Sequence, residues 1–426
     1  MLTNNTLNMN RENVELSLAA GRTKTRMLCS AALISLLLFS SCDAQNPTKW
    51  RGPTGEGLYA SINLLSEWPE DGPEILWSFE ELGKGHSSAV ISGDNMYTSG
   101  MIDSSGHIFK LDLDGNLVYD KIYGPEYVES FYGTRGSPTI VGDKVYLVSG
   151  YGVLMCLEED SGDIVWEKDM VNEFGGDTLR WGSCETPVVD GDIVYATPGG
   201  PMHNVIALNR NDGSLIWTCK GKGELSAYCT PLLINHNGRK ILTTHTTSHL
   251  LGIDANSGEL LWTHPQANKW SVHANTPVYR DGGLFYCSGY GQGSGKLLLN
   301  EEGTKVKQAW KNTLDSRMGG AVLVDGNLYA SGDNFRDWKS INWETGEDNY
   351  ASDTIAKGVV IFADKKLFAY SDKGELALIN ATPDEFALVS KIRVTKGSEQ
   401  HWAHPVINEG VLYLRHGKAM IAYKIK

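Results

Sequence analysis

The chain has 426 residues, of which 41% are hydrophobic and 21% are charged, with 47 glycines and only 14 prolines. This composition is typical of a globular, turn-rich protein and excludes a disordered or collagen-like chain. The formal net charge of -13 predicts a surface that repels phosphate backbones, so we expect no nucleic-acid partner.

The N-terminus carries a processing signal. Three basic residues within positions 22–26 precede an apolar run from Leu28 to Phe39, which ends in Ser-Ser-Cys42. This run is too short to span a membrane, and a cysteine after small residues at its end resembles a bacterial lipobox. We predict that residues 1–41 are a lipoprotein signal peptide and that lipid is attached at Cys42.

The alternative for this segment is a plain secretory signal that is cleaved nearby, and either signal exports the protein. About 20 residues precede the basic stretch, which is long for such a signal, so we expect the true start to lie further along the chain.

The remaining cysteines are scattered and odd in number, and none forms a C-x-x-C pair. They therefore predict neither a zinc site nor a disulfide framework, and we expect small buried hydrophobic side chains and no metal site. These cysteines are Cys156, Cys184, Cys219, Cys229 and Cys287.

A sequence unit recurs at intervals of about 40 to 50 residues, a period expected of propellers or solenoids. Its opening is a hairpin in which alternating apolar residues flank a glycine-containing turn. The clear copies are residues 137–150, 185–199, 275–289 and 319–332, and weaker copies are residues 87–100, 229–245, 358–371 and 404–417.

The second half of each unit is a strand, a polar turn and a strand that ends in tryptophan, as in residues 156–168, 207–219 and 252–264. Each unit thus yields four strands, and the mature chain shows no helical periodicity. We predict an all-β fold, a closed eight-bladed β-propeller of four-stranded antiparallel blades.

The last unit supplies only three strands and ends at residue 426, whereas residues 73–79 form a strand before the first complete opening. We predict that this N-terminal strand completes the C-terminal blade and closes the ring, because closure leaves no long strand edge exposed. Residues 42–72 would then be a lead-in and residues 73–426 the propeller.

Two features resemble the pyrroloquinoline-quinone-like propeller family. The pattern L-x-x-x-x-G-x-x-x-W around Trp166, Trp217 and Trp262 is similar to its tryptophan-docking motif, and residues 49–60 and 67–77 resemble its entry sequence. The resemblance implies that each of these tryptophans, and Trp77 with them, packs on a glycine-containing turn of a neighbouring blade. The motif is altered at Tyr119, Trp310 and Tyr350.

This family includes quinone-dependent dehydrogenases and also cofactor-free lipoproteins such as the outer-membrane assembly scaffold, so fold does not decide function. The dehydrogenases carry adjacent cysteines and a calcium site of Glu, Asn and Asp. This chain has no Cys-Cys pair, and Glu185 is the one acid placed for such a site, whereas calcium requires six or more oxygens.

We therefore expect an exported, lipid-anchored, monomeric module of the cell envelope, facing the periplasm or held at the outer membrane, that binds a ligand or partner or acts as a scaffold. The alternative is a dehydrogenase acting on an alcohol or sugar with pyrroloquinoline quinone as its cofactor. An anionic small molecule and an envelope protein both remain open as partners.

Propeller ligands usually bind at the mouth of the central channel, and the loops that enter the inner strands supply basic and aromatic side chains there. We predict a ligand-binding funnel that favours an anion such as a carboxylate or phosphate. Its candidates are His86, Arg135, Arg180, Trp181, Tyr228, His273, Arg317, Lys357, His401 and Trp402.

A second set of loops adds His203, His245, His249 and Arg336 to the same expected face. The alternative for each basic residue is a structural ion pair, for which Asp177, Glu224 and Asp315 are available, and the aromatic residues could simply be packing. No nucleophile, phosphate loop or pair of carboxylates is evident.

Overall fold

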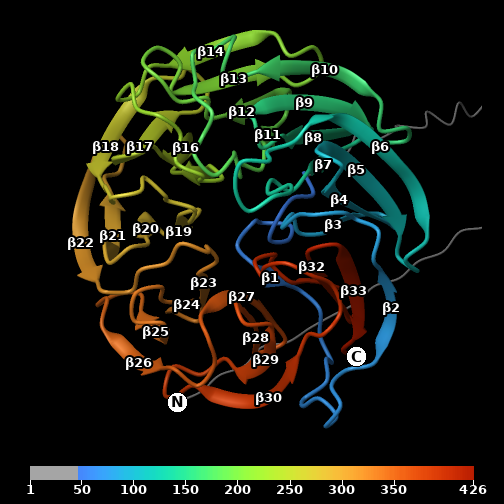
Figure 1. Ribbon diagram of the computed structural model, residues 1–426. Helices are drawn as coiled ribbons and strands as arrows, with labels where there is room; N and C mark the ends of the chain where they lie inside the picture. Colours follow the sequence, from blue (N-terminus) through green and yellow to red (C-terminus); the bar gives the residue numbers. More distant parts are fainter. Residues whose placement is uncertain (1–46) are drawn as a thin grey trace, which may run out of the picture. The chain divides into compact units, whose positions relative to one another are not determined.

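The residues described by the computed structural model, 47–426, contain 33 strands and no helix (Figure 1). The strands form eight sheets, arranged as the blades of a propeller, so the predicted fold is confirmed. The predicted signal peptide and Cys42 lie outside the described residues.

The first four blades follow the chain in order. Blade one contains β3 (Val90–Ser92), β4 (Asn95–Ile102), β5 (Ser105–Asp112) and β6 (Leu117–Pro125). Blade two contains β7 (Thr139–Val141), β8 (Lys144–Val148), β9 (Val153–Glu158) and β10 (Ile164–Asp169). Blade three contains β11 (Val188–Asp190), β12 (Ile193–Ala196), β13 (Val205–Asn209) and β14 (Leu215–Cys219). Blade four contains β15 (Leu232–His236), β16 (Arg239–His245), β17 (His249–Asp254) and β18 (Leu260–Pro265).

The next three blades are built in the same way. Blade five contains β19 (Val278–Arg280), β20 (Gly283–Ser288), β21 (Gly293–Leu299) and β22 (Val306–Asn312). Blade six contains β23 (Val322–Val324), β24 (Asn327–Ser331), β25 (Trp338–Asn342) and β26 (Asp348–Ser352). Blade seven contains β27 (Gly358–Ala363), β28 (Lys366–Ser371), β29 (Glu375–Asn380) and β30 (Ala387–Arg393), and β1 (Leu58–Tyr59) joins it as a fifth strand.

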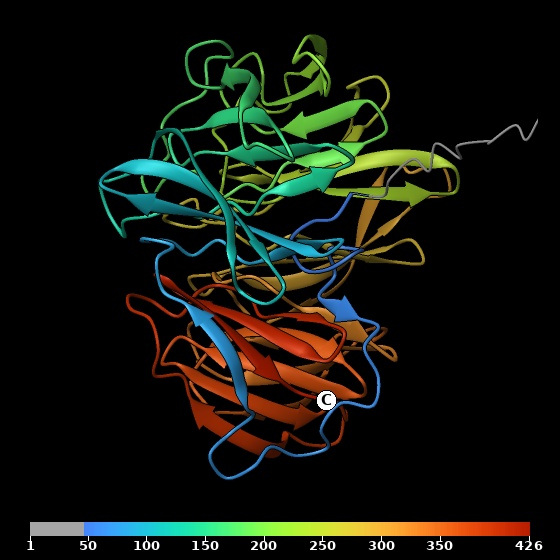
Figure 2. The same cartoon turned by 90° about the vertical axis from the view of Figure 1, so that its right-hand side faces the viewer.

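Blade eight joins the two ends of the described chain. It contains β31 (Val406–Asn408), β32 (Val411–His416) and β33 (Ala419–Lys424) together with β2 (Ile75–Phe79). β2 pairs antiparallel with β33, with Trp77 opposite Ala422, and Figure 2 shows the two strands side by side. The predicted closure of the ring by an N-terminal strand is confirmed.

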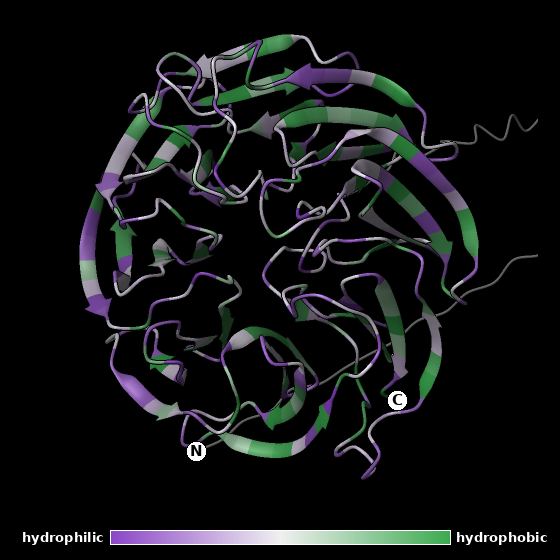
Figure 3. Ribbon diagram, viewed as in Figure 1, coloured by the Kyte–Doolittle hydropathy of each residue, from purple (hydrophilic) through white to green (hydrophobic). Residues whose placement is uncertain are grey.

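The middle strands of the blades are buried on both faces, because each blade packs between two neighbours. In β8, for example, Val145–Val148 are all buried. The outer strands are more polar and banded (Figure 3), and each carries a register shift against its neighbour, as between Ile164 and Trp166 in β10. The shift leaves Ile164 and Val165 exposed and turns Trp166 inward, so this bulge aims the docking residue at the next blade.

Docking between blades follows the expected pattern at Trp77, Trp166 and Trp217. Each indole N–H donates to a carbonyl of the next blade, at 2.8, 2.9 and 3.1 Å. Each ring lies over a glycine whose added Cβ would meet it at 3.0 Å or less. The acceptors are Leu113, Arg210 and Ala255, and the glycines are Gly115, Gly213 and Gly258.

The docking expected at Trp262 is wrong. Its buried indole N–H has no partner within residues 47–426. Its ring lies over Gly252 of its own blade and packs with Leu284 and Leu297 of blade five without reaching a glycine turn there. Conversely, Trp310 does dock despite its altered motif, with its N–H 3.0 Å from the carbonyl oxygen of Trp343. In blade one, Tyr119 takes the place of the docking tryptophan. Its hydroxyl donates to the carbonyl oxygen of Glu159 in blade two at 3.2 Å.

Residues 48–59 form what we call the N-terminal hairpin, which lies among the inner strands (Figure 1). Thr48 pairs antiparallel with Ile140 in β7, with both N···O distances 2.9 Å, and Leu58 pairs parallel with Phe362 in β27. The inner strands run from the mouth of the channel toward the turns that join first and second strands. The hairpin therefore rises along blade two from the turn side and returns along blade seven.

Candidate functional site

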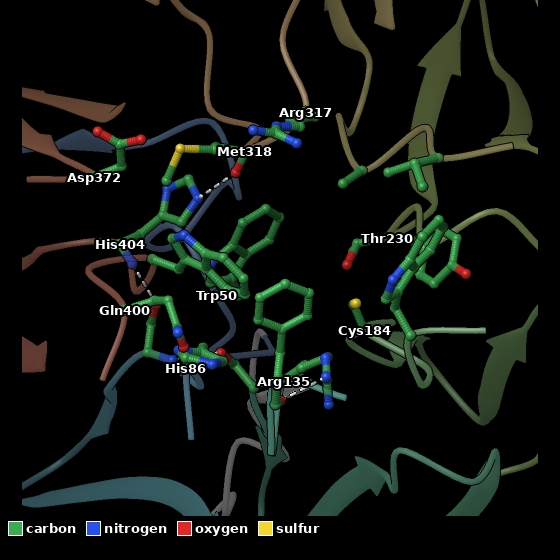
Figure 4. A pocket seen from close by; sticks show the side chains of 18 of the residues that line it. Trp50, His86, Arg135, Cys184, Thr230, Arg317, Met318, Asp372, Gln400 and His404 are labelled. Atoms are coloured by element: carbon green, nitrogen blue, oxygen red, sulfur yellow. Dashed lines mark hydrogen bonds between the residues drawn. The ribbon is translucent and has the colours of Figure 1, made fainter. Parts of the chain in front are cut away.

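A cavity of about 700 Å³ opens at the mouth, where the chain enters the inner strands. Seven of the ten predicted funnel residues line it: His86, Arg135, Trp181, Tyr228, Arg317, Lys357 and Trp402. Figure 4 shows Trp50, His404 and Met318 on one side of the cavity and Thr230 and Cys184 on the other. The closed ring thus brings together side chains that are distant in sequence, and their ligand-binding role stays a prediction.

The other three predicted residues do not line the cavity. Arg180 is exposed beside it. His273 is fully buried, and its Nε2 lies 3.1 Å from the carbonyl oxygen of Thr247. His401 stacks on His416, with ring centroids 3.8 Å apart. The two histidines follow the inner-strand pattern in sequence, but their rings turn between blades.

The second set of loops does not reach the cavity either. His245 stacks on His273 at a centroid distance of 5.0 Å, His249 bonds Glu224 at 2.7 Å, and His203 bonds Thr218 at 2.8 Å. Arg336 does not line the cavity. Of the histidines expected to crowd this face, His86 lines the cavity wall, and His404 lines it as well. The other rings take part in packing and hydrogen bonds within the scaffold.

Aromatic rings form two sides and the floor of the cavity. On one side, Trp402 packs against His86 and Phe131, with ring centroids 4.7 and 5.1 Å apart. On the other side, Trp181 packs against Tyr228 and Trp270, at 6.0 and 5.9 Å. At the floor, Trp50 at the tip of the N-terminal hairpin lies edge-on to His404. The tip of the hairpin therefore forms part of the cavity wall.

Sequence reasoning missed four of these aromatic residues as site residues: Trp50, Phe131, Trp270 and Tyr290. Trp50 lies in the segment that was expected only as a lead-in. The others lie in loops between strands, where no periodic pattern marks an inward-facing position. Aromatic residues in the loops that precede inner strands were the one available signal.

Arg135 is held by backbone carbonyls and forms no salt bridge with a carboxylate of residues 47–426. Its guanidinium donates to the carbonyl oxygens of Gly133, Ser130 and Phe131 at 2.7 to 2.8 Å and lies 5.2 Å from the ring centre of Tyr127. The alternative of a structural ion pair therefore does not hold here. Arg135 instead fastens the loop that carries Phe131 to the cavity rim.

That alternative does hold for Arg317 and Lys357. Both bond the same carboxylate, Asp333, which lies 3.0 Å from Arg317 Nε. Two of the acids expected to form these ion pairs have other partners. Asp315 accepts from backbone N–H groups such as that of Gly291, at 2.7 Å, and Glu224 bonds His249. Two cations thus share the Asp333 carboxylate, and Asp372 on the same wall also acts electrostatically on Arg317.

Burial decides the charge of the other titratable groups at the site. Burial, followed by the nearby Arg135 and Arg415, lowers the pKa of His86 to about 3, and burial also lowers the pKa of His404 well below its usual value. Burial raises the pKa of Glu185, behind the wall, to about 8. At neutral pH these histidines are uncharged and Glu185 is protonated, so the cavity charge comes from its arginines and lysines.

The residues at the mouth do not fit a calcium-bound quinone. Glu185 is buried, and its carboxylate accepts from the Thr197 N–H at 3.1 Å. Among the described residues, Asp372 is the one carboxylate that lines the cavity, and residues 47–426 hold no group of three or more His, Cys, Asp or Glu side chains placed for a metal. Calcium requires six or more oxygen ligands, and one carboxylate on the wall supplies far fewer. The residues at the mouth would therefore not hold a calcium-bound quinone.

The sequence profile of the family described as outer membrane protein assembly factor BamB matches residues 69–338. The chain belongs to this family. A BamB from Shewanella oneidensis is 24% identical over 228 residues, which are 53% of this chain and 52% of the relative. A BamB from Salmonella typhimurium is 25% identical over 133 residues, 31% of this chain and 29% of the relative. The matches thus span about half, or less, of these relatives.

Solved structures share the fold. The crystal structure of BamB from Moraxella catarrhalis superposes with a TM-score of 0.61 at 14% identity, over 83% of this chain and 98% of that one. Quinohemoprotein alcohol dehydrogenase from Comamonas testosteroni gives a TM-score of 0.66 at 11% identity, over 90% and 80%. The predicted membership of the pyrroloquinoline-quinone-like propellers is confirmed. At these identities the likeness concerns the fold alone.

Proposed function

We propose that this protein is an exported, lipid-anchored scaffold of the cell envelope that binds a partner at the mouth of its propeller during outer-membrane protein assembly. Its membership of the BamB family supports the assembly role. The sequence signal that ends at Cys42 supports export and a lipid anchor. The envelope location, with the propeller facing the periplasm or held at the outer membrane, follows from both.

The cavity carries this proposal. It has aromatic walls and cationic groups, and the tip of the N-terminal hairpin contributes Trp50 to its floor. Aromatic and arginine side chains dominate the binding energy of protein interfaces. No general base paired with a nucleophile lines the described wall, which favours binding over catalysis at this site.

In-cell photocrosslinking tests the partner role. A photoreactive phenylalanine analogue replaces Phe131 at the rim and, as the matched control, Val165 on the outer strand of blade two. We expect the same envelope protein to be crosslinked repeatedly from position 131 and not from position 165. Equal crosslinking from both positions, or none from 131, would contradict the proposal.

Loss of the gene should also lower the amount of folded outer-membrane protein.

Membrane fractionation tests the anchor. We expect the wild-type protein in the detergent phase with acyl chains on Cys42, and Cys42→Ala in the aqueous phase. Mass spectrometry of the mature N-terminus identifies the modified residue. Acyl chains that persist on Cys42→Ala would refute lipidation at this position.

The dehydrogenase alternative is tested in the same preparations. Pyrroloquinoline quinone and calcium are added to the purified protein, and dye-linked oxidation of alcohols and sugars is recorded. We expect no activity above that of the buffer, because the cavity lacks the oxygens for calcium. Substrate-dependent dye reduction would favour the enzyme instead.

A further inference from the structure

We propose that the partner segment bound at the mouth is acidic and carries an aromatic side chain that enters the cavity. This inference rests on the proposed function and adds the chemistry of the partner. It is carried by the positive charge at the mouth, the exposed rings around it and the aromatic lining of the cavity.

Four arginines at or beneath the mouth have no carboxylate partner within residues 47–426. Arg135 donates to carbonyl groups, as described above. Arg51 lies beneath the floor, is 3% exposed, and donates to the carbonyl oxygens of Ala321 and Glu56 at 2.7 and 2.9 Å. Because carbonyl groups satisfy hydrogen bonds but carry no net charge, these hydrogen bonds do not compensate the two positive charges. Within residues 47–426 the carboxyls of Glu56 and Glu126 act on Arg51 and Arg135 through space, without a salt bridge.

The other two of these arginines lie on opposite sides of the mouth. Arg415 is 1% exposed, close to His86, and its Nε donates to the carbonyl oxygen of Gly417 at 2.8 Å. Arg180 is exposed, and its guanidinium lies 5.1 and 5.0 Å from the ring centres of Trp181 and Trp270. Positive charge therefore surrounds the cavity.

The described acidic groups nearby offset only part of this charge. Burial raises the pKa of Glu126, the carboxyl beside Arg135, and Glu56 acts on Arg51 beneath the mouth. Glu185 is protonated at neutral pH, and Asp333 is shared by Arg317 and Lys357. Asp372 remains on the wall, next to Lys373. In a chain whose net charge is -13, this concentration of positive charge at one mouth attracts an anionic partner.

The exposed aromatic rings favour a protein segment over a small anion. Phe131 and Tyr132 are each 48% exposed and Trp270 is 39% exposed, and they extend the apolar surface beyond the cavity. Trp270 and Arg180 form a cation–π pair at the rim, and tryptophan with arginine is typical of interface hot spots. An aromatic side chain of such a segment would pack on the rings that line the cavity, among them Trp50 at its floor.

Peptide binding to the purified full chain in detergent tests this inference. The probe is a fluorescent peptide of four glutamates around one phenylalanine, and its matched control has four lysines instead. We expect the acidic peptide to bind, the basic peptide not to bind, and affinity to fall about tenfold between 50 and 300 mM NaCl, because exposed charges are screened.

Arg180→Gln is the informative variant. The Arg180 guanidinium donates no hydrogen bond within the described residues, so its loss should not disturb the fold. We expect it to weaken acidic-peptide binding about tenfold, the loss typical of one charge-assisted contact. Arg280→Gln makes the same charge change at the far end of the inner strand β19, on the turn side, and should leave binding unchanged.

Three results would overturn the inference: equal binding of the basic peptide, equal loss in both variants, or phenylacetate binding as tightly as the acidic peptide. The last would identify a small anion as the ligand. If position 131 crosslinks a partner in cells while the acidic peptide does not bind, the proposed function stands and the acidic segment is wrong.

Discussion

Trp50 lies edge-on to His404, with their ring centroids 4.9 Å apart and their planes at 79°. Trp50 belongs to the N-terminal hairpin, and His404 precedes the first strand of blade eight. His404 Nε2 also lies 3.4 Å from the carbonyl oxygen of Met318 in blade six's entry loop (Figure 4). The cavity floor thus joins the hairpin to two blades.

Trp50→Ala should lower the free energy of unfolding by about 2 kcal/mol. Truncation of a fully buried tryptophan costs about 3–5 kcal/mol, and Trp50 is only partly buried. Urea unfolding measures the loss. Limited proteolysis should also cut the hairpin faster, because its tip loses the contact with His404.

Trp270→Ala is the matched control for this experiment. Its ring is at the rim and 39% exposed, so the loss should stay below about 1 kcal/mol. Equal losses for the two variants would mean that Trp50 does not fasten the hairpin.

Arg415 should be among the costliest residues to replace. Its guanidinium, from β32 of blade eight, donates to the carbonyl oxygens of Ser87 and Ser99 in blade one as well as to Gly417. Arg415→Met leaves these buried acceptors unsatisfied, at about 1–3 kcal/mol each. We expect a loss of at least about 3 kcal/mol in urea unfolding. The exposed Arg393→Met should cost less than about 0.5 kcal/mol, and a similar value for Arg415→Met would contradict its role at the ring junction.

The two outcomes of tryptophan docking can be separated by phenylalanine variants. Trp77→Phe removes an N–H bond to Leu113 across the closing blade and should cost about 1 kcal/mol beyond the lost ring area. Trp262→Phe removes a buried N–H that has no partner within residues 47–426. Removal of this unsatisfied donor is favourable and should offset part of the free energy lost because the smaller ring buries less area. Thermal unfolding of both variants measures the difference. A larger loss for Trp262→Phe would mean that its N–H is satisfied in solution.

The sequence predicted the ring because propeller blades repeat local patterns. The hairpins, the polar turns and the outer-strand tryptophans each recur, and the strand that contains Trp77 was assigned to the last blade by counting strands. Each of these features is encoded within one repeat or in the number of repeats, so no long-range packing had to be known.

The interior of the channel could not be predicted in the same way. The N-terminal hairpin occurs once, and its partners Ile140 and Phe362 lie in blades two and seven. The positions of His273 and His401 matched the inner-strand pattern, but the pattern fixes only the backbone and not the side to which a ring turns. Likewise, the ion pairs of Asp333 join blade six to the loop that enters blade seven, and nothing local in the sequence marks them.

Glu185 should make the stability of the protein depend on pH. It is 2% exposed. Burial, opposed by hydrogen bonds from Thr197, raises its pKa from 4.5 to about 8 in the folded protein. Between these two values the unfolded chain has lost the proton and the folded chain keeps it. The free energy of unfolding therefore falls as pH rises through this window, by up to about 1.4 kcal/mol per pH unit, and the contribution is constant below pH 4.5 and above pH 8.

Glu185→Gln isolates this effect, because the amide keeps an acceptor for the Thr197 N–H and cannot ionise. Urea unfolding at pH 5, 6, 7 and 8 should show the variant gaining stability over the wild type at each step, with the largest difference at pH 8. Glu167→Gln on the exposed face of β10 changes the same group outside the cavity wall and should run parallel to the wild type. Since other titrating residues contribute equally to the wild type and the variant, their effects cancel in the difference. Parallel curves for Glu185→Gln and the wild type would mean that the Glu185 carboxyl is ionised in the folded protein, which would add a negative charge behind the cavity wall and weaken the attraction of an acidic partner.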